Sequence, residues 1–108
     1  DFQDVAHVER EMVLIKVAVE ERTRGEIWNT VNIFRAKVID AGVRSFVIEV
    51  TGDEGKISAI LDLLKPLGVK EIVRTGKVAV QRGLNTLSAT TPEKTVELKR
   101  KRHKEKVA

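Results

Sequence analysis

The stretch Ser45 to Lys56, S-F-V-I-E-V-T-G-D-E-G-K, decides the fold of this chain. Every second side chain in its first half is apolar: Phe46, Ile48 and Val50. Alternation with period two is typical of a strand that buries one face. Gly52 then ends the pattern, and Asp53 is placed to cap a following helix. The stretch therefore predicts a buried strand followed by a helix, and it offers no group arranged for catalysis.

The totals indicate one domain with appendages. The chain has 108 residues, of which 42% are hydrophobic and only 4% aromatic, so aliphatic side chains must build the core. No run approaches the roughly 20 apolar residues of a membrane-spanning helix. The first residues are acidic and lack an initiating Met, which is unlike a signal peptide and leads us to expect a piece of a longer protein. The absence of Cys excludes disulfides and thiolate metal sites.

The formal net charge of +4 belongs to the C-terminal tail. Residues 93–108 contain seven Lys or Arg against three Glu, and the rest of the chain contains 13 basic and 13 acidic residues. A basic run such as K-R-K-R-H-K (99–104) binds nucleic acid in some proteins. Because no aromatic residue interleaves it and the body is neutral, a solvated charge run is the favoured interpretation.

The pattern predicts the element order β-α-β-β-α-β. Residues 1–9 are expected to be a linker remnant, 10–83 the folded domain and 84–108 a disordered or frayed helical tail. Within the domain, strands are predicted at 10–19, 37–41, 46–51 and 69–75, with 78–80 as an extension of the last. One helix is predicted to begin at a capping box formed by Thr23 and Glu26. A second helix is predicted from Asp53 to Leu64, and Pro66 and Gly68 are expected to end it.

This order is typical of an α+β fold, the ferredoxin-like βαββαβ sandwich, with an antiparallel sheet and two helices on one face. The first and third strands are the most apolar and are expected at its centre. The sheet face without helices would then show a half-apolar set, which is the candidate interface: Met12, Leu14, Lys16, Val47 and Glu49. Such a face is seldom left exposed, so we expect a partner to cover it. Lys16 and Glu49 are placed to form a surface ion pair.

The sequence contains few groups that are arranged for chemistry. His7 falls in the expected linker and His103 in the tail, so neither has a rigid neighbour that would position an acid or base. Residues 52–56, G-D-E-G-K, lack the spacing of a phosphate-binding loop, and a strand-to-helix turn is favoured. Residues 74–77, R-T-G-K, would suit an anion, although a turn at a strand end is favoured. Trp28 is expected at the edge of the core or of an interface. No catalytic, cofactor-binding or metal-binding residue is predicted.

Four segments carry a resemblance to a known family: V-E-R-E-M-V-L-I-K-V (8–17), E-I-W-N-T-V-N-I-F-R-A-K-V-I-D (26–40), S-F-V-I-E-V-T-G-D-E-G-K-I (45–57) and K-E-I-V-R-T-G-K-V-A-V-Q-R-G (70–83). Together they resemble the C-terminal domain of the acetolactate synthase (acetohydroxyacid synthase) small regulatory subunit. The resemblance covers residues 8–83, and residues 84–108 lie outside it.

The resemblance implies a non-catalytic regulatory domain with an ACT-like fold. Such a subunit binds and activates a separate catalytic subunit, which carries thiamine diphosphate, magnesium and FAD and acts in valine, leucine and isoleucine biosynthesis. It implies a cytoplasmic protein, or a plastid protein in a plant, that forms a homo-oligomer and has neither nucleic-acid nor membrane partners. No cofactor is expected in this chain itself.

One segment departs from the amino-acid-binding pattern of the family. ACT domains bind valine through a loop of the E-N-x-P-G-V type, which in the small subunit belongs to a preceding N-terminal domain. Here the corresponding residues 20–26 read E-E-R-T-R-G-E, without Pro. We therefore expect the valine site in a missing ACT domain. The alternative function is a free-standing ACT-like homodimer that senses an amino acid, and nucleic-acid binding through the tail is a third.

Overall fold

The computed structural model describes residues 7–84 and the backbone of 104–106. The elements follow the order β1 (His7–Ala18), α1 (Glu21–Ile33), β2 (Lys37–Ala41), β3 (Ser45–Gly52), α2 (Glu54–Gly68), β4 (Val69–Gln81) and β5 (Lys104–Lys106). The first six form the predicted βαββαβ unit. The sheet has the order β2-β3-β1-β4-β5 with antiparallel pairing throughout, so β1 and β3 lie inside it as expected.

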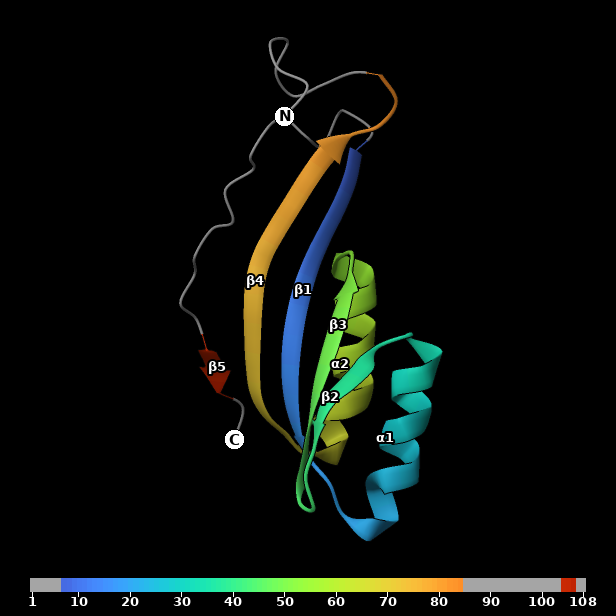
Figure 1. Ribbon diagram of the computed structural model, residues 1–108, viewed down its shortest axis with the longest axis vertical. Coiled ribbons are helices and arrows are strands. Elements are labelled where there is room, and N and C mark those ends of the chain that lie inside the picture. The colour runs from blue at the N-terminus through green and yellow to red at the C-terminus, as the bar shows by residue number, and fades with distance from the viewer. Residues whose placement is uncertain (1–6, 85–103, 107–108) are drawn as a thin grey trace.

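Both helices cover one face of the sheet, and the other face is free of helices (Figure 1). The core lies between the two layers. From the sheet it takes the odd-numbered apolar residues of β1 and the even-numbered ones of β3, with Ile15 paired directly to Ile48. From α2 it takes the four predicted inner positions, all at most 4% exposed: Ile57, Ile60, Leu61 and Leu64. The period-two and helical patterns therefore predicted the core correctly.

Strand β1 begins earlier than the sequence indicated. His7 to Glu9 were assigned to a linker, but they belong to β1 and pair with Gln81 to Ala79 of β4. The sequence did not indicate this, because residues 7–9 show only weak alternation of apolar and polar side chains. Their backbones pair with β4 without that alternation. As a result β1 and β4 extend together beyond β3 and the helices (Figure 1).

Helix α1 also begins earlier than predicted, at Glu21 rather than after Thr23. The N-cap residue is Glu20, whose backbone N–H donates to the Thr23 hydroxyl at 3.1 Å. The Thr23 hydroxyl in turn donates to the Glu20 carbonyl oxygen at 3.2 Å. Thr23 is thus the third residue of the helix and is buried, so the predicted capping box with Glu26 was wrong by one turn.

Helix α2 continues past the predicted end and contains Pro66 in its last turn. Proline has no N–H to donate to the carbonyl oxygen four residues earlier, so the last turn lacks one backbone hydrogen bond. Leu67, the next residue, is partly buried and packs against the core. Gly68, at a φ of 109°, then turns the chain into β4.

The tail prediction lies largely outside the described residues. Within the part that the structure describes, Lys104 to Lys106 form the short edge strand β5 against Glu71 to Val73 of β4. A frayed helix or disorder was expected for this segment, and the strand differs from that expectation. The residues of this basic run do not favour a strand by themselves. Their pairing with β4 depends on the edge that β4 offers, which the local sequence does not indicate.

Candidate interaction face

The helix-free side of the sheet brings the five predicted interface residues together. Met12, Leu14 and Lys16 alternate along β1, and Val47 and Glu49 lie beside them on β3. The register pairs Leu14 with Glu49 and Lys16 with Val47. We call this surface the open face, and it comprises Met12, Leu14, Lys16, Val47 and Glu49 with two further residues from β4, Glu71 and Val73. All of them are partly exposed, Lys16 the most clearly.

The two β4 residues were missed from the sequence. Val73 pairs with Leu14 and Glu71 with Lys16, so both lie on the open face. Finding them requires the register between β1 and β4, which shifts twice along the strands and cannot be read from alternation alone. Together with Leu14, Lys16 and Val47 they line an open depression of about 180 Å³, the Lys16 depression.

The ion pair of Lys16 was assigned to the wrong strand. Its Nζ lies 3.4 Å from Oε1 of Glu71 on β4, not beside Glu49. The register explains this, because Lys16 stands directly opposite Glu71, whereas Glu49 stands opposite Leu14 and Lys37. At a half-exposed site such a pair contributes about 0–1 kcal/mol. It places one charge of each sign in the middle of an apolar face.

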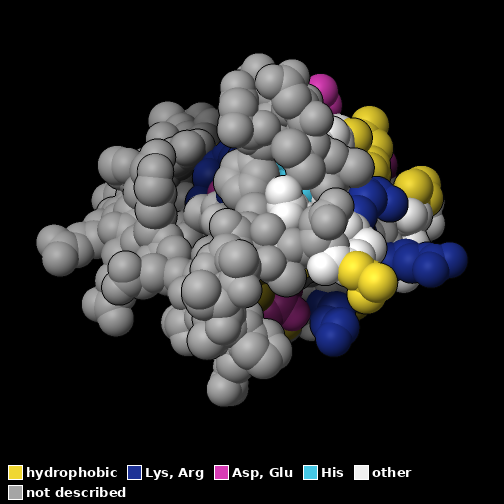
Figure 2. Space-filling view, turned by 90° about the horizontal axis from the view of Figure 1, so that it is seen from above, with side chains coloured by type: hydrophobic (Ala, Val, Ile, Leu, Met, Phe, Trp, Pro, Cys, Tyr) yellow, Lys and Arg dark blue, Asp and Glu magenta, His cyan; other side chains and the backbone are white. Residues whose placement is uncertain are grey.

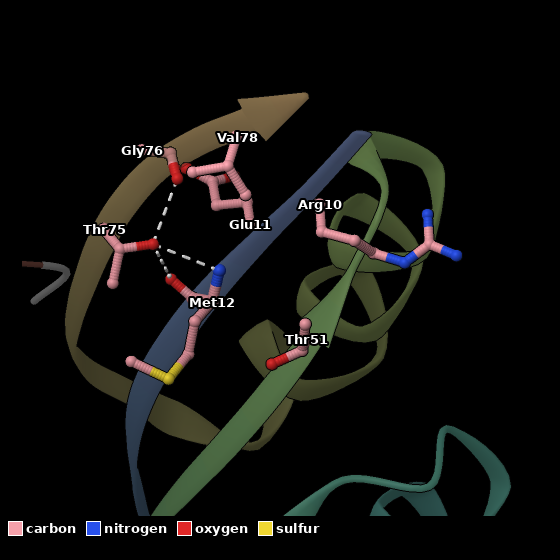
Figure 3. A pocket seen from close by; sticks show the side chains of 7 residues that line it. All are labelled: Arg10, Glu11, Met12, Thr51, Thr75, Gly76 and Val78. Carbon is pink, nitrogen blue, oxygen red and sulfur yellow. Dashed lines mark hydrogen bonds between the residues drawn. The ribbon is translucent and has the colours of Figure 1, made fainter. Parts of the chain in front are cut away.

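A β-bulge occupies residues that the sequence suggested as an anion-binding turn. Residues Thr75 and Gly76 fall where the register shifts opposite Met12, inside one continuous strand. The Thr75 hydroxyl accepts a hydrogen bond from the Met12 N–H at 3.2 Å and is 3.1 Å from the Met12 carbonyl oxygen (Figure 3). Gly76 has a φ of 90°, a conformation that favours glycine. The strand-end turn that was favoured for these residues is therefore a bulge.

The bulge borders a second depression of about 210 Å³ on the same side of the sheet (Figure 3), lined by Arg10, Glu11, Met12, Thr51, Thr75, Gly76 and Val78. Met12 and Thr51 are cross-strand neighbours there. Met12 thus adjoins this bulge depression, and Leu14 lines the Lys16 depression. The open face therefore has two shallow hollows in line along β1.

Arg74 is engaged by a carboxylate on the helix-covered side. Its Nη1 lies 3.4 Å from Oε1 of Glu11, a residue only 7% exposed. Arg74 pairs with Val13 in the register, which places it with the core-facing residues. A buried carboxylate needs such a charged partner, since burial alone would penalise its ionised form. This contact supports a structural role for Arg74.

Comparison with known proteins identifies the family. A family model described as the small subunit of acetolactate synthase matches residues 10–83. The chain belongs to the acetolactate synthase small-subunit family. The match ends before the tail and includes every element from α1 to β4.

Individual members of the small-subunit family support this. The chain is 52% identical over 86 residues to the acetolactate synthase small subunit of Aquifex aeolicus, covering 79% of this chain and 45% of that protein. It is 55% identical over 76 residues to a probable acetolactate synthase small subunit of Archaeoglobus fulgidus, covering 70% and 48%. The chain thus spans about half the length of these relatives.

A solved structure of the family confirms the fold. The crystal structure of the acetolactate synthase small subunit from Thermotoga maritima matches with a TM-score of 0.67 and 46% sequence identity, covering 72% of this chain and 48% of that one. The resemblance to the C-terminal domain of the small regulatory subunit, first made from four sequence segments, is therefore confirmed.

Residues 7–84 of this small-subunit domain do not bring together the side chains of a metal site. No group of three His, Asp or Glu side chains among them is placed to hold a metal ion. His7 lies in β1, with Nε2 3.9 Å from Oε2 of Glu9, and His103 is outside the described residues. Asp53 accepts a hydrogen bond from the Lys56 N–H at 2.9 Å and so caps α2, as the strand-to-helix interpretation predicted.

Trp28 and the basic side chains lie at partly exposed positions of the described domain. Trp28 on α1 is 40% exposed and packs edge-on against the buried ring of Phe46, with ring centroids 5.3 Å apart. Viewed down the long axis, the described Lys and Arg side chains lie among hydrophobic ones (Figure 2). Neither of the two described helices is long and apolar enough to cross a membrane.

Proposed function

We propose that this chain is a non-catalytic regulatory domain that binds and activates the catalytic subunit of acetolactate synthase, in the synthesis of valine, leucine and isoleucine. The catalytic subunit would be a separate chain carrying thiamine diphosphate, magnesium and FAD. Membership of the small-subunit family supports the partner. The observation that carries the proposal is the open face, which gives such a partner a surface to contact.

The open face has the composition of a contact surface. Met12, Leu14, Val47 and Val73 supply partly exposed apolar area on two inner strands and β4, where most soluble domains place polar side chains. Each square ångström of such area removed from water stabilises a complex by about 25 cal/mol before the costs of association. The Lys16–Glu71 pair and Glu49 supply charges that give the contact a fixed orientation. The open face thus combines apolar area with a few charged groups set within it, a mixed composition that protein interfaces also show.

Activation follows if the domain binds the competent conformation of the catalytic subunit better than the incompetent one. The ratio of the two affinities sets the coupling free energy, which is typically about 1–3 kcal/mol between regulatory sites. A domain with equal affinity for both conformations would bind and have no effect. The proposal therefore predicts that binding and activation are lost together when the face is altered.

The test mixes the full chain, or its variants, with a catalytic subunit from the same source and measures both affinity and acetolactate formation. Leu14→Asp and Val47→Asp place a charge at the centre of the open face, and we expect each to weaken binding by about tenfold or more. Both side chains point away from the core, so the fold should be retained, which circular dichroism and a urea transition would verify.

The matched control is Leu63→Asp, the same substitution at a site on α2 that is 48% exposed. It lies on the helix layer, on the other side of the sheet from the open face (Figure 1). Its affinity and activation should stay close to those of the wild-type chain. If Leu14→Asp and Val47→Asp activate as well as this control does, the open face is not the contact surface.

A further inference from the structure

The outer edge of β4 is a second place where this chain can hold a partner. β4 is the edge strand of the βαββαβ unit next to β1, so its backbone groups on the far side from β1 have no neighbour within that unit. An edge of this kind presents a row of N–H and C=O groups that pair readily with another extended segment. In this structure β5 occupies part of that edge.

The pairing is antiparallel and short. It aligns Glu71 with Lys106, Ile72 with Glu105 and Val73 with Lys104, and it leaves the outer side of the remaining β4 residues without a strand partner among the described residues. Ile72, in its middle, is buried in the core, which fixes the position of the β4 backbone at this point. The edge is therefore a rigid template.

The charge of the segment around Lys104–Lys106 is opposite to that of a residue on β4. The residue of β4 aligned with Lys106 is Glu71, which is partly exposed, and the segment 99–106 contains six basic residues and one acidic one. The segment that pairs with this position of β4 is thus strongly basic in sequence. The family model ends at residue 83, so β5 adds to the matched domain rather than belonging to it.

We propose that the outer edge of β4 is a strand-addition site, and that its occupant is this chain's own segment Lys104–Lys106, which can be displaced. Three residues of pairing form a weak contact, because short edge strands open at a small fraction of the global unfolding free energy. Since Glu71 and Val73 also belong to the open face, the segment borders that face and widens the sheet beside it.

Hydrogen exchange of the full chain tests this directly. Glu105→Pro removes the central N–H of β5 and restricts the residue before it, so pairing with Ile72 should be lost. Among Glu71, Ile72 and Val73, the amides that point toward β5 should then exchange about tenfold faster or more. Those that point toward β1 should keep their protection and serve as an internal reference.

Two controls make the result specific. Glu105→Thr keeps the backbone donor and favours a strand, so it should retain the wild-type protection. A peptide of residues 99–108 added to the Glu105→Pro chain should restore the lost protection, whereas the same peptide carrying the proline should not. Wild-type protection that is independent of protein concentration supports occupation within one chain. Equal exchange of the three amides in all variants, or protection that appears only at high concentration, would overturn the proposal.

Discussion

At the scale of the residue, the Thr75 side chain makes hydrogen bonds that backbone groups make elsewhere between β1 and β4. The bulge at Thr75 and Gly76 interrupts the regular ladder between β1 and β4 opposite Met12. The Thr75 hydroxyl contacts both backbone polar groups of Met12, and it is also 3.0 Å from the Gly76 carbonyl oxygen. This hydroxyl thus maintains the contact between the strands where the open face and the bulge depression meet.

Thr75→Val should therefore destabilise the domain. Valine has nearly the same shape but leaves the Met12 N–H without this partner, which costs about 1–3 kcal/mol when the group is kept from water. Urea unfolding followed by circular dichroism measures the change in the free energy of unfolding. The control is Thr51→Val on the neighbouring strand, an exposed position that should change stability by less than about 0.5 kcal/mol. Equal effects of the two substitutions would contradict this role of Thr75.

At the scale of the element, α2 is the helix whose sequence and structure agree most closely. Asp53 caps its first turn, Glu54 places a negative charge near its N-terminus and Lys65 a positive charge near its C-terminus. Both charges interact favourably with the helix dipole, which is positive at the N-terminus and negative at the C-terminus. The buried residues then follow the helical period against β1 and β3. Local signals and packing agree here, which is why the prediction succeeded apart from the last turn.

Asp53→Ala should weaken α2 by removing the side chain that accepts the Lys56 N–H. Losing an N-cap of this kind costs about 0.5–2 kcal/mol, so we expect the thermal midpoint to fall measurably. Asp62→Ala is the matched control, because Asp62 is exposed on the same helix and does not cap it. Its midpoint should be equal to or slightly above that of the wild type, since alanine favours helix. A fall as large as that of Asp53→Ala would contradict the capping role.

At the scale of the whole molecule, the segment between β1 and α1 argues against amino-acid binding by this chain alone. The N–H groups of Thr23 and Arg24 already donate to the Glu20 carbonyl oxygen, at 3.0 and 2.9 Å. Glu21 adds negative charge in the first turn of this helix, and the Glu20 carboxylate pairs with Arg22, whose Nε lies 2.9 Å from Oε1 of Glu20. That this chain does not bind valine by itself is the prediction that follows from the absence of the family's proline-containing loop in residues 20–26.

Isothermal titration calorimetry of the full chain with valine should accordingly show no saturable binding up to about 1 mM, a range in which weak binding free energies near −4 kcal/mol are still detectable. Tight binding of one valine per chain would contradict this prediction and favour the alternative of a free-standing amino-acid sensor.

The candidate interface shows where prediction from sequence stops. Met12, Leu14 and Val47 could be assigned to one face because alternation fixes the side to which each residue points. Glu71 and Val73 could not, because their side of the sheet depends on a bulge and a register shift in β4. The Lys16 ion pair was misassigned for the same reason. Pairing between strands is a property of two segments, and one segment alone does not encode it.

The sequence by itself determined the βαββαβ order, the core residues, the strand-to-helix turn at Asp53 and the family. Each of these depends on the local period of apolar residues, on capping residues or on residue identity. All three can be read from residues that are close together in the sequence. The tertiary structure alone decided the partner of Lys16, the bulge at Thr75 and Gly76, the partly buried Glu11–Arg74 contact and the pairing of Lys104–Lys106 with β4. These depend on contacts between distant segments, whose register is set by the packing of the whole sheet.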